Sequence, residues 1–556
     1  MNQRERDPSE SDRGDTATRI GEALVLWRQL LGADAVLTGE ACLPYSRCTM
    51  ARPRRIPAAL KPRSEAELVE IVRIAARQRV PLYPISTGRN WGYGSANPVL
   101  DDNVVVDLSA MAEILEIDAA LGTARLQPGV TQGQLADHLE RHGLPFMVPV
   151  TGAGPGCSIV GNALERGYGI TPHSDHFAAV LGLRAVLADG SLYESPLSEK
   201  VGPARGRLHK WGVGPYIDGL FGQGAFGIVT EMSFALARRP ERTGLVLFEI
   251  ADKAALGRVV EAVRALLQTL PGHIGGINLL NRLRVLSMID RYPADAAPAG
   301  ATLPEEVVET LARRRRLPAW LGLGALYAPR GLWRGVCREI RRALAPHCRR
   351  VDFFTGERIT FLQHMAAWVP GTSGELLRSR LAALAGAHDL AAGRPRETAL
   401  GLAYWRSGRR PETGPLDPAR DGCGLAWYSP VVPLTAAAAQ SYVEMVETIC
   451  PRYGIEPLIT LTTLSERCFD STVPLLFDAE RDRERAQACY AALLAAGRER
   501  GFLPYRLNID AAAQFFGDRG SIFWPLVARL KAAADPSGII APGRYNPMGS
   551  HLNQDE

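Results

Sequence analysis

Residues 84–94 form a glycine-rich stretch, PISTGRNWGYG, that constrains the fold of this chain more than any other segment. A helical pattern precedes the stretch at residues 64–79, and a β-rich segment follows from Val104. Its three glycines let the backbone approach a ligand where a Cβ atom would block it. Successive exposed N–H groups in such a turn make a nest for an anion, which suits a pyrophosphate. Glycine loops are common, so the interpretation depends on the segments around this one.

Helices and strands alternate around the loop. Ser64 and Glu67 form a capping box at the start of a helix predicted over residues 64–79. A second capped helix is predicted over residues 131–142, and residues 181–194 are typical of a β-hairpin. Further strands are predicted at residues 80–85, 104–108, 123–126, 245–250 and 424–428. This alternation indicates an α+β or α/β domain.

Composition places the chain among ordinary globular proteins. It has 556 residues, of which 46% are hydrophobic and 22% charged, so two or more domains are expected. The net charge of +5 does not indicate a nucleic-acid partner. No apolar run reaches the length of about eighteen residues that a membrane-spanning helix needs, so no membrane association is expected. The nine cysteines lack CxxC pairs, which favours reduced thiols and a cytoplasmic enzyme.

Changes in residue composition along the chain predict the domain organisation. Residues 1–20 are polar, lack the apolar segment of a signal peptide, and are predicted to be a disordered tail. Residues 21–241 are expected to form a first domain rich in glycine loops. Residues 242–502 alternate alanine- and arginine-rich helices with short strands, which is typical of a separate α+β domain. Residues 503–556 are rich in turn residues near their end and are expected to return to the first domain.

Six segments, taken in order, resemble the FAD flavoproteins of the vanillyl-alcohol oxidase and 4-cresol dehydrogenase family. They are ISTGRNWGYGSA at 85–96, SIVGNALERG at 158–167, TPHSDH at 171–176, GPYIDGLFGQGAFGIVT at 214–230, PYR at 504–506 and DPSGIIAPGR at 535–544. Together they span nearly the whole chain after residue 50, so the match is specific. The resemblance implies the α+β, two-domain fold called the p-cresol methylhydroxylase type. Residues 21–241 and 503–556 would form its FAD-binding domain, and residues 242–502 an α+β cap domain over the flavin ring.

The resemblance also implies FAD as the cofactor, held through backbone N–H groups of the glycine loops. The cap segment at residues 421–430 contains no histidine for flavin attachment, so noncovalent FAD is expected, with Tyr428 and Cys423 as conceivable attachment points. Asn90 stands where flavoproteins with two covalent links have a histidine. The expected cofactor-binding residues are Ser86, Thr87, Gly88, Arg89, Asn90, Gly92, Gly152, Gly154, Gly156, Ser158, Gly161, Asn162, Gly167, Gly227, Ile228, Val229, Arg506 and Arg544.

Members of the resembled family oxidise para-substituted phenols. Hydride leaves the benzylic carbon for the flavin while the phenol is held as a phenolate, which gives a quinone methide. Stabilising that phenolate requires preorganised donors and a cation in a dry site. The resemblance assigns these catalytic roles to Tyr93, Tyr505 and Arg506, and an irregular backbone is expected at the last two. It also implies a small aromatic substrate, oxygen or a redox protein as electron acceptor, and a possible homodimer.

Two positions depart from the family pattern. Ile170 stands where a third phenolate-binding tyrosine is expected, and Ala153 where the family has an acid/base side chain. These departures favour a larger or differently activated phenol. They leave open a second hypothesis, the oxidation of a non-phenolic alcohol, hydroxy acid or biosynthetic intermediate. A third hypothesis is a flavin-binding protein without catalysis.

Other chemistries receive less support from the sequence. His173, Asp175 and His176 are too few to predict a metal site, so no metal is expected. No cysteine stands beside a clear base, so no nucleophilic thiol is predicted. Residues 151–162 carry glycines but no dinucleotide fingerprint. The arginine-rich runs at 313–316 and 338–350 are interpreted as solvated helix faces, with docking of an acidic partner as the alternative.

Overall fold

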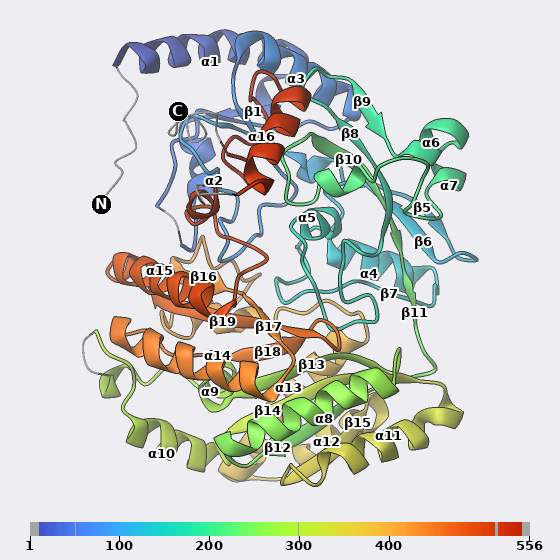
Figure 1. The fold of residues 1–556 in the computed structure, drawn as a ribbon, viewed down its shortest axis with the longest axis vertical. Coiled ribbons are helices and arrows are strands. Elements are labelled where there is room, and N and C mark those ends of the chain that lie inside the picture. The colour runs from blue at the N-terminus through green and yellow to red at the C-terminus, as the bar shows by residue number, and fades with distance from the viewer. Residues whose placement is uncertain (1–9, 51, 298–299, 517–520, 548–556) are drawn as a thin grey trace.

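The chain folds into two domains, one above the other in Figure 1, in a computed structural model that describes residues 10–50, 52–297, 300–516 and 521–547. The upper domain contains the N-terminal segments together with the C-terminal helix α16 (Phe523–Ala534). The lower domain, which is the cap, is built on one eight-stranded sheet that begins at Arg242. This arrangement is the expected mixture of helices and sheets.

A four-stranded sheet carries the first glycine loop. Strand β3 runs parallel to β4, and the loop leaves the carboxyl end of β3. The C-terminal segment joins this sheet, because the N–H of Leu82 donates to Ile539 (2.7 Å) and the N–H of Ala541 donates to Leu82 (2.7 Å). The strand order is β1 (Val36–Thr38), β2 (Ala58–Leu60), β4 (Val104–Asp107), β3 (Leu82–Ile85).

Helix α3 (Glu65–Gln78) packs on this sheet as its sequence predicts. Ser64 caps the helix by accepting a hydrogen bond from the N–H of Glu67 at 3.2 Å, and the apolar face is buried. Helix α1 (Glu10–Leu31) lies against α3, and the indole of Trp27 donates to the carbonyl of Ile71.

The predicted disordered tail over residues 1–20 is therefore wrong from Glu10 onward, while residues 1–9 lie outside the described part. Among residues 15–31 of α1, whose burial is described, Ile20, Ala23 and Trp27 are buried, and they recur at helical spacing. Because residues 15–19 contribute no buried apolar side chain to that face, composition alone does not reveal this part of the helix.

A five-stranded antiparallel sheet completes the first domain. The predicted hairpin is confirmed in β8 and β9, where Asp189 accepts from the N–H of Ser191 at 2.8 Å. Helix α4 (Gln132–Arg141) begins with the predicted capping box between Thr131 and Gln134. The strand order is β5 (Ile114–Asp118), β6 (Thr123–Leu126), β10 (Ile228–Ala235), β8 (Val180–Val186), β9 (Leu192–Glu194). The two-stranded ribbon β7 (Phe146–Met147) and β11 (Ala237–Arg238) leads toward the cap.

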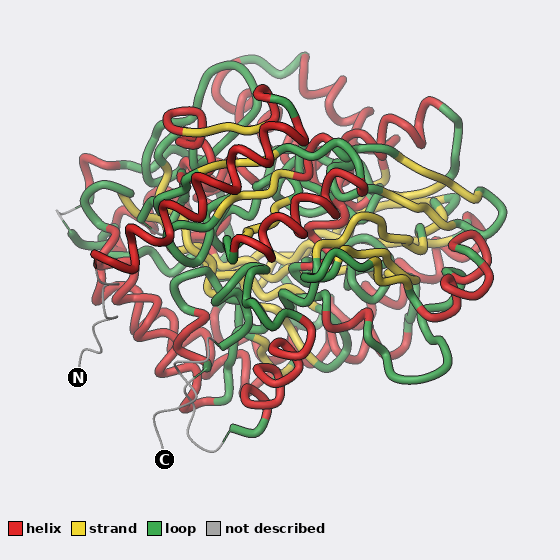
Figure 2. The backbone as a smooth tube through the Cα atoms, turned by 90° about the horizontal axis from the view of Figure 1, so that it is seen from above, coloured by secondary structure: helices red, strands yellow, loops and turns green. Residues whose placement is uncertain are grey.

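Helices pack on both faces of the cap sheet. In the view of Figure 2 most of the strands, drawn in yellow, lie among surrounding red helices. Apolar side chains of α8 (Leu256–Thr269), α11 (Arg330–Leu344), α14 (Ala436–Ile449) and α15 (Arg483–Arg500) form the main core on one face. Helices α9 (Arg282–Ile289) and α13 (Gly371–Ala391) pack on the other. Its strands are β12 (Arg242–Ile250), β13 (Ile274–Asn281), β14 (Trp320–Ala328), β15 (Arg350–Thr355), β16 (Cys423–Tyr428), β17 (Val431–Pro433), β18 (Thr460–Thr463) and β19 (Cys468–Asp478).

The chain returns from the cap to the first domain through residues 501–511. Val431 donates to the carbonyl of Leu503 at 3.0 Å, and Ile509 donates to the carbonyl of Tyr93 at 3.0 Å. This loop therefore ties the cap strand β17 to the first glycine loop. Tyr505 and Arg506 lie between these two anchors in an irregular bend, as expected. Across the described ranges no helix combines the length and apolarity required to span a membrane.

Candidate active site

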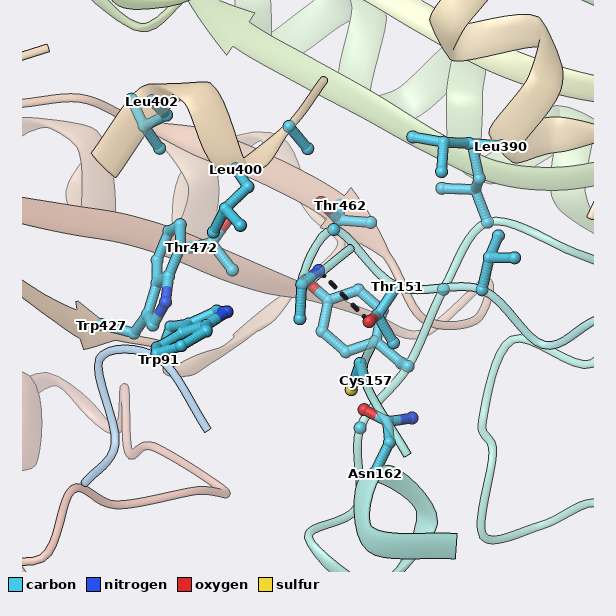
Figure 3. A pocket seen from close by; sticks show the side chains of 18 of the residues that line it. Trp91, Thr151, Cys157, Asn162, Leu390, Leu400, Leu402, Trp427, Thr462 and Thr472 are labelled. Carbon is cyan, nitrogen blue, oxygen red and sulfur yellow. Dashed lines mark hydrogen bonds between the residues drawn. The ribbon is translucent and has the colours of Figure 1, made fainter. Parts of the chain in front are cut away.

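A cavity of about 930 Å³ lies between the two domains. Glycine loops of the first domain form one wall, and the other wall comes from the cap strands and α13. In Figure 3, Thr151, Cys157 and Asn162 lie on one side of the cavity, and Trp427 of the cap lies beside Trp91 on another. The lining differs between the two walls: polar loop residues line the cavity on the side of the first domain, and leucines line it on the side of the cap.

Most of the residues predicted to hold the cofactor line this cavity. They come from five separate parts of the sequence that the fold brings together. The lining members are Ser86, Thr87, Gly88, Arg89, Asn90, Gly152, Ser158, Gly161, Asn162, Gly167, Gly227, Ile228, Val229, Arg506 and Arg544. Their convergence on one wall is what a dinucleotide with two phosphates and a flat ring system requires.

Three predicted glycines do not line the cavity and instead permit close packing. A Cβ atom on Gly92, whose φ is +75°, would overlap the indole of Trp427 in the cap. A Cβ atom on Gly156 would overlap the guanidinium of Arg89. Gly154 adopts a φ of +90° beside Glu397. The structure therefore explains these three glycines by their backbone conformation and by the side chains packed against them, without a contact to the cofactor.

The lining residues fit FAD. Gly88 has a φ of +66°, and a Cβ atom on Gly161 would meet the Oγ of Ser86 at 2.8 Å, so side chains are excluded where backbone must approach a ligand. The buried Nε atom of Arg544 has no hydrogen-bond partner among the described residues, and the Nε atom of Arg506 has only the Glu165 carboxylate, at 3.5 Å. Buried donors of this kind are normally satisfied, so a ligand is expected to accept from them.

Arg506 lies at the centre of the proposed catalytic group. Its guanidinium carbon is 4.1 Å from the ring centroid of Tyr93, and its Nη2 donates to Oδ1 of Asn90 at 2.5 Å. Burial lowers its pKa, but the Glu165 carboxylate and nearby tyrosines outweigh burial and raise the pKa above its ordinary value. Arg506 is thus a permanent cation on the cavity wall.

Glu165 holds two arginines in place, although the sequence analysis did not single it out. Its Oε2 accepts from Nη2 of Arg544 at 2.7 Å and lies 3.5 Å from Nε of Arg506. Burial raises the pKa of Glu165, but Arg544 and Arg506 more than reverse this and lower it. Two guanidinium groups face one carboxylate, so this wall carries an excess positive charge that suits an anionic ligand.

Tyr93 and Tyr505 lie near Arg506, and Tyr168 neighbours Tyr505. The hydroxyl of Tyr93 hydrogen-bonds Oγ of Ser429 at 2.9 Å, and the ring of Tyr505 lies 6.4 Å from that of Tyr168. Burial raises the pKa of each phenol group. All three therefore stay protonated at neutral pH and can donate hydrogen bonds to an anion.

Tyr168 and Ile170 both line the cavity. Position 170 carries no tyrosine, but Tyr168, two residues earlier, lies next to Tyr505. Ile170 packs against Gly276 of the cap, and its carbonyl accepts from the hydroxyl of Tyr327 at 3.1 Å. The site thus retains a third aryl hydroxyl.

Asp470 is a second residue that the sequence analysis missed. It lies on β19, fully buried behind the cavity wall. Burial raises its pKa to about 7, against the opposing influence of the Tyr168 hydroxyl and Arg506. A carboxyl group with such a pKa is suited to exchange a proton near neutrality. No short sequence motif predicts a role for Asp470, because it is a single acidic residue within a buried strand.

Ala153 lines the cavity with no titratable group, as its sequence position implies. The conceivable flavin-attachment residues lie elsewhere. Tyr428 donates to the carbonyl of Leu493 in the cap core, and Cys423 packs in a separate apolar cluster. Neither residue lines the cavity. His176 contacts Asn162 through its Nδ1, which places the TPHSDH segment behind the second glycine loop.

Comparison with known proteins defines the family. Residues 56–195 match the family model described as FAD binding domain. Over 95% of its length the chain is 35% identical to 1'-carboxy-chondrochloren decarboxylase of Chondromyces crocatus, of which it covers 97%. Over 98% of its length it is 28% identical to the 4-cresol dehydrogenase (hydroxylating) flavoprotein subunit of Pseudomonas putida, of which it covers 98%. The solved structure of p-cresol methylhydroxylase with substrate bound superimposes with a TM-score of 0.84 at 26% identity, covering 97% of this chain and 98% of that one.

The chain is an FAD-dependent oxidoreductase with the α+β, two-domain fold predicted from its sequence. It belongs to the p-cresol methylhydroxylase-type family of FAD flavoproteins. The resemblance drawn from the six sequence segments is confirmed.

Proposed function

We propose that this enzyme oxidises the benzylic carbon of a para-substituted phenol that it binds as a phenolate. The observation that carries the proposal is the grouping of Arg506 with the hydroxyl-bearing residues Tyr93, Tyr168 and Tyr505 on the cavity wall. A permanent cation beside neutral aryl donors is complementary to an oxyanion. The relationship to 4-cresol dehydrogenase supports the same substrate class.

Each residue of the site would have a distinct role toward the substrate. Arg506 stabilises the phenolate electrostatically, and Tyr93 and Tyr505 orient it through hydrogen bonds. Ionisation of the phenol raises electron density at the para position and favours loss of hydride from the attached carbon. Bound FAD supplies the acceptor for that hydride and its two electrons. The cap keeps water from the reacting carbon, and Arg544 shares with Glu165 the task of holding Arg506 in place.

A second candidate is oxidative decarboxylation, in which a carboxylated phenol loses hydride and then carbon dioxide. The bond to the carboxyl carbon breaks, its electron pair forms a C=C bond to the oxidised benzylic carbon, and the ring becomes phenolate again. No water is added and no proton is transferred in that step. Ala153 favours this candidate, because the cavity has no acid/base group at that position. The similarity to 1'-carboxy-chondrochloren decarboxylase supports it as well.

Anaerobic reduction of the flavin tests the proposed function. The purified yellow protein is mixed with 4-ethylphenol, 3-(4-hydroxyphenyl)propanoate, a benzyl alcohol without the phenol hydroxyl and a 2-hydroxy acid. Bleaching by the phenols alone is expected. Bleaching by the 2-hydroxy acid alone would replace the phenol proposal with the second hypothesis from the sequence.

Product analysis and the electron acceptor complete the assignment. Carbon dioxide and a 4-vinylphenol product from the propanoate would select decarboxylation. Hydroxylation or plain dehydrogenation of 4-ethylphenol would select the first candidate. We propose oxygen or a redox protein as the acceptor, which reoxidation with and without an artificial dye distinguishes.

A further inference from the structure

Arg284 is a buried cation that the proposed mechanism does not use. It lies in the first turn of α9 in the cap, after the N-cap residue Asn281, and is only 8% exposed. Its side chain lines the same cavity as Arg506. Nε donates to the Oγ1 of Thr460 at 3.1 Å, and the buried Nη1 has no hydrogen-bond partner among the residues that the structure describes.

No carboxylate of the described residues neutralises this guanidinium. Within the described ranges, no aspartate or glutamate oxygen lies within 4.0 Å of Arg284. Burial lowers its pKa to about 10, and the only charge effect on it comes from the phenol of Tyr168. The neighbouring cavity residues on β13 and β18 are neutral, namely Asn278, Thr460 and Thr462. A buried charge without a partner is costly, so such a residue is retained where a ligand supplies the counter-charge.

Tyr168 shows that Arg284 lies close to the proposed phenolate site, because it neighbours both Arg284 and Tyr505. Its ring lies 6.4 Å from that of Tyr505, and its hydroxyl influences the ionisation of Arg284. One tyrosine side chain therefore borders both positions.

We propose that Arg284 binds a carboxylate on the side chain of the substrate, so that the substrate is a para-substituted phenol carrying a nearby carboxylate. The planar fork of a guanidinium matches a carboxylate with two parallel hydrogen bonds, and Nη1 is free to make one of them. The inference rests on the proposed function for the position of the ring. It concerns binding, and it holds whether the carboxylate stays in the product or leaves as carbon dioxide.

Two ligands that cannot be oxidised test the inference. In (4-hydroxyphenoxy)acetate and 4-ethoxyphenol an ether oxygen replaces the benzylic carbon, and the two differ in a carboxylate against a methyl group. Their dissociation constants for the holoenzyme are measured by isothermal titration calorimetry. The carboxylate is expected to bind at least tenfold more tightly than the ether. In Arg284→Met that preference is lost, while the affinity for 4-ethoxyphenol changes less than about twofold.

Matched variants keep the result interpretable. Arg282→Met removes an arginine from the same helix that does not line this cavity, and it is expected to retain the preference for the carboxylate. Arg284→Lys keeps the charge without the fork and is expected to bind the carboxylate with intermediate affinity. Circular dichroism and FAD content establish that each variant is folded.

Three outcomes overturn the inference. The first is equal affinity of the wild type for the two ligands. The second is an equal loss of affinity for both ligands in Arg284→Met, which would mean that Arg284 binds the phenolate or the flavin. The third is an unchanged carboxylate preference in that variant. Failure of the proposed function is seen separately, as a flavin that 4-ethylphenol does not bleach.

Discussion

Replacing Arg506 by alanine tests the electrostatic basis of the site. The guanidinium lies 4.1 Å from the ring centroid of Tyr93 and is buried, so a phenolate beside it interacts at short range and with little screening. Two unit charges about 4 Å apart at an effective dielectric constant of about 20 interact by about 4 kcal/mol. Some of this is recovered because Arg544 remains paired with Glu165 at 2.7 Å. We expect a net loss of about 3 kcal/mol, or roughly a hundredfold in kcat/KM.

The assay is anaerobic stopped-flow reduction of the flavin by 4-ethylphenol, with FAD content measured for each variant. Arg338→Ala, at an exposed position on α11, is the control and should reduce at the wild-type rate. In the single variant the Glu165 carboxylate loses one of its two arginine partners. The double variant Arg506→Ala/Glu165→Gln separates this effect from the loss of the Arg506 cation. A flavin-replete Arg506→Ala enzyme that reacts within threefold of the wild type would refute the role assigned to Arg506.

Three further predictions follow from buried polar groups. Tyr93→Phe should weaken binding of a phenolate inhibitor and slow flavin reduction together, and unchanged affinity would mean that the hydroxyl serves only Ser429, 2.9 Å away. Asp470 has a pKa raised by burial from 3.8 to about 7, so the folded protein keeps a proton that the unfolded chain releases. Stability should therefore fall as pH rises from about 4 to 7, and urea unfolding of Asp470→Asn should lack this component; identical pH profiles would contradict it. Asp535→Asn leaves the ammonium of Lys531, now 2.7 Å from that carboxylate, buried without its anion, so unfolding in urea should show a loss of about 3–5 kcal/mol, and a loss below about 1 kcal/mol would contradict the pairing.

Segments with strong local signals were predictable from the sequence. Ser64 and Thr131 begin helices where a capping box predicts them, because capping depends on residues three positions apart. The glycine loop after β3 has the positive φ angles that its composition implies. Tyr93 and Arg506 could be named because each stands in a short segment that resembles a known family.

Other site residues carried no local signal. Glu165 lies inside a segment that matched the family and Tyr168 directly follows it, yet their roles depend on partners hundreds of residues away, such as Arg544. Asp470 and Arg284 lie in ordinary cap elements, and only burial without a matching charge distinguishes them. Gly92 was read as a cofactor contact because loop composition does not reveal which face of the loop meets Trp427.

The sequence by itself predicted glycine loops and capped helices, because backbone conformation and helix capping are local properties of the chain, and its resemblance to a known family implied FAD and a two-domain α+β fold. Only the tertiary structure decided which side chains share the cavity with Arg506 and which buried charges lack a partner. Ionisation and electrostatic complementarity depend on distances between segments far apart in sequence. For that reason the unpaired guanidinium of Arg284, and the carboxylate it implies, became visible only after the cap was placed over the first domain.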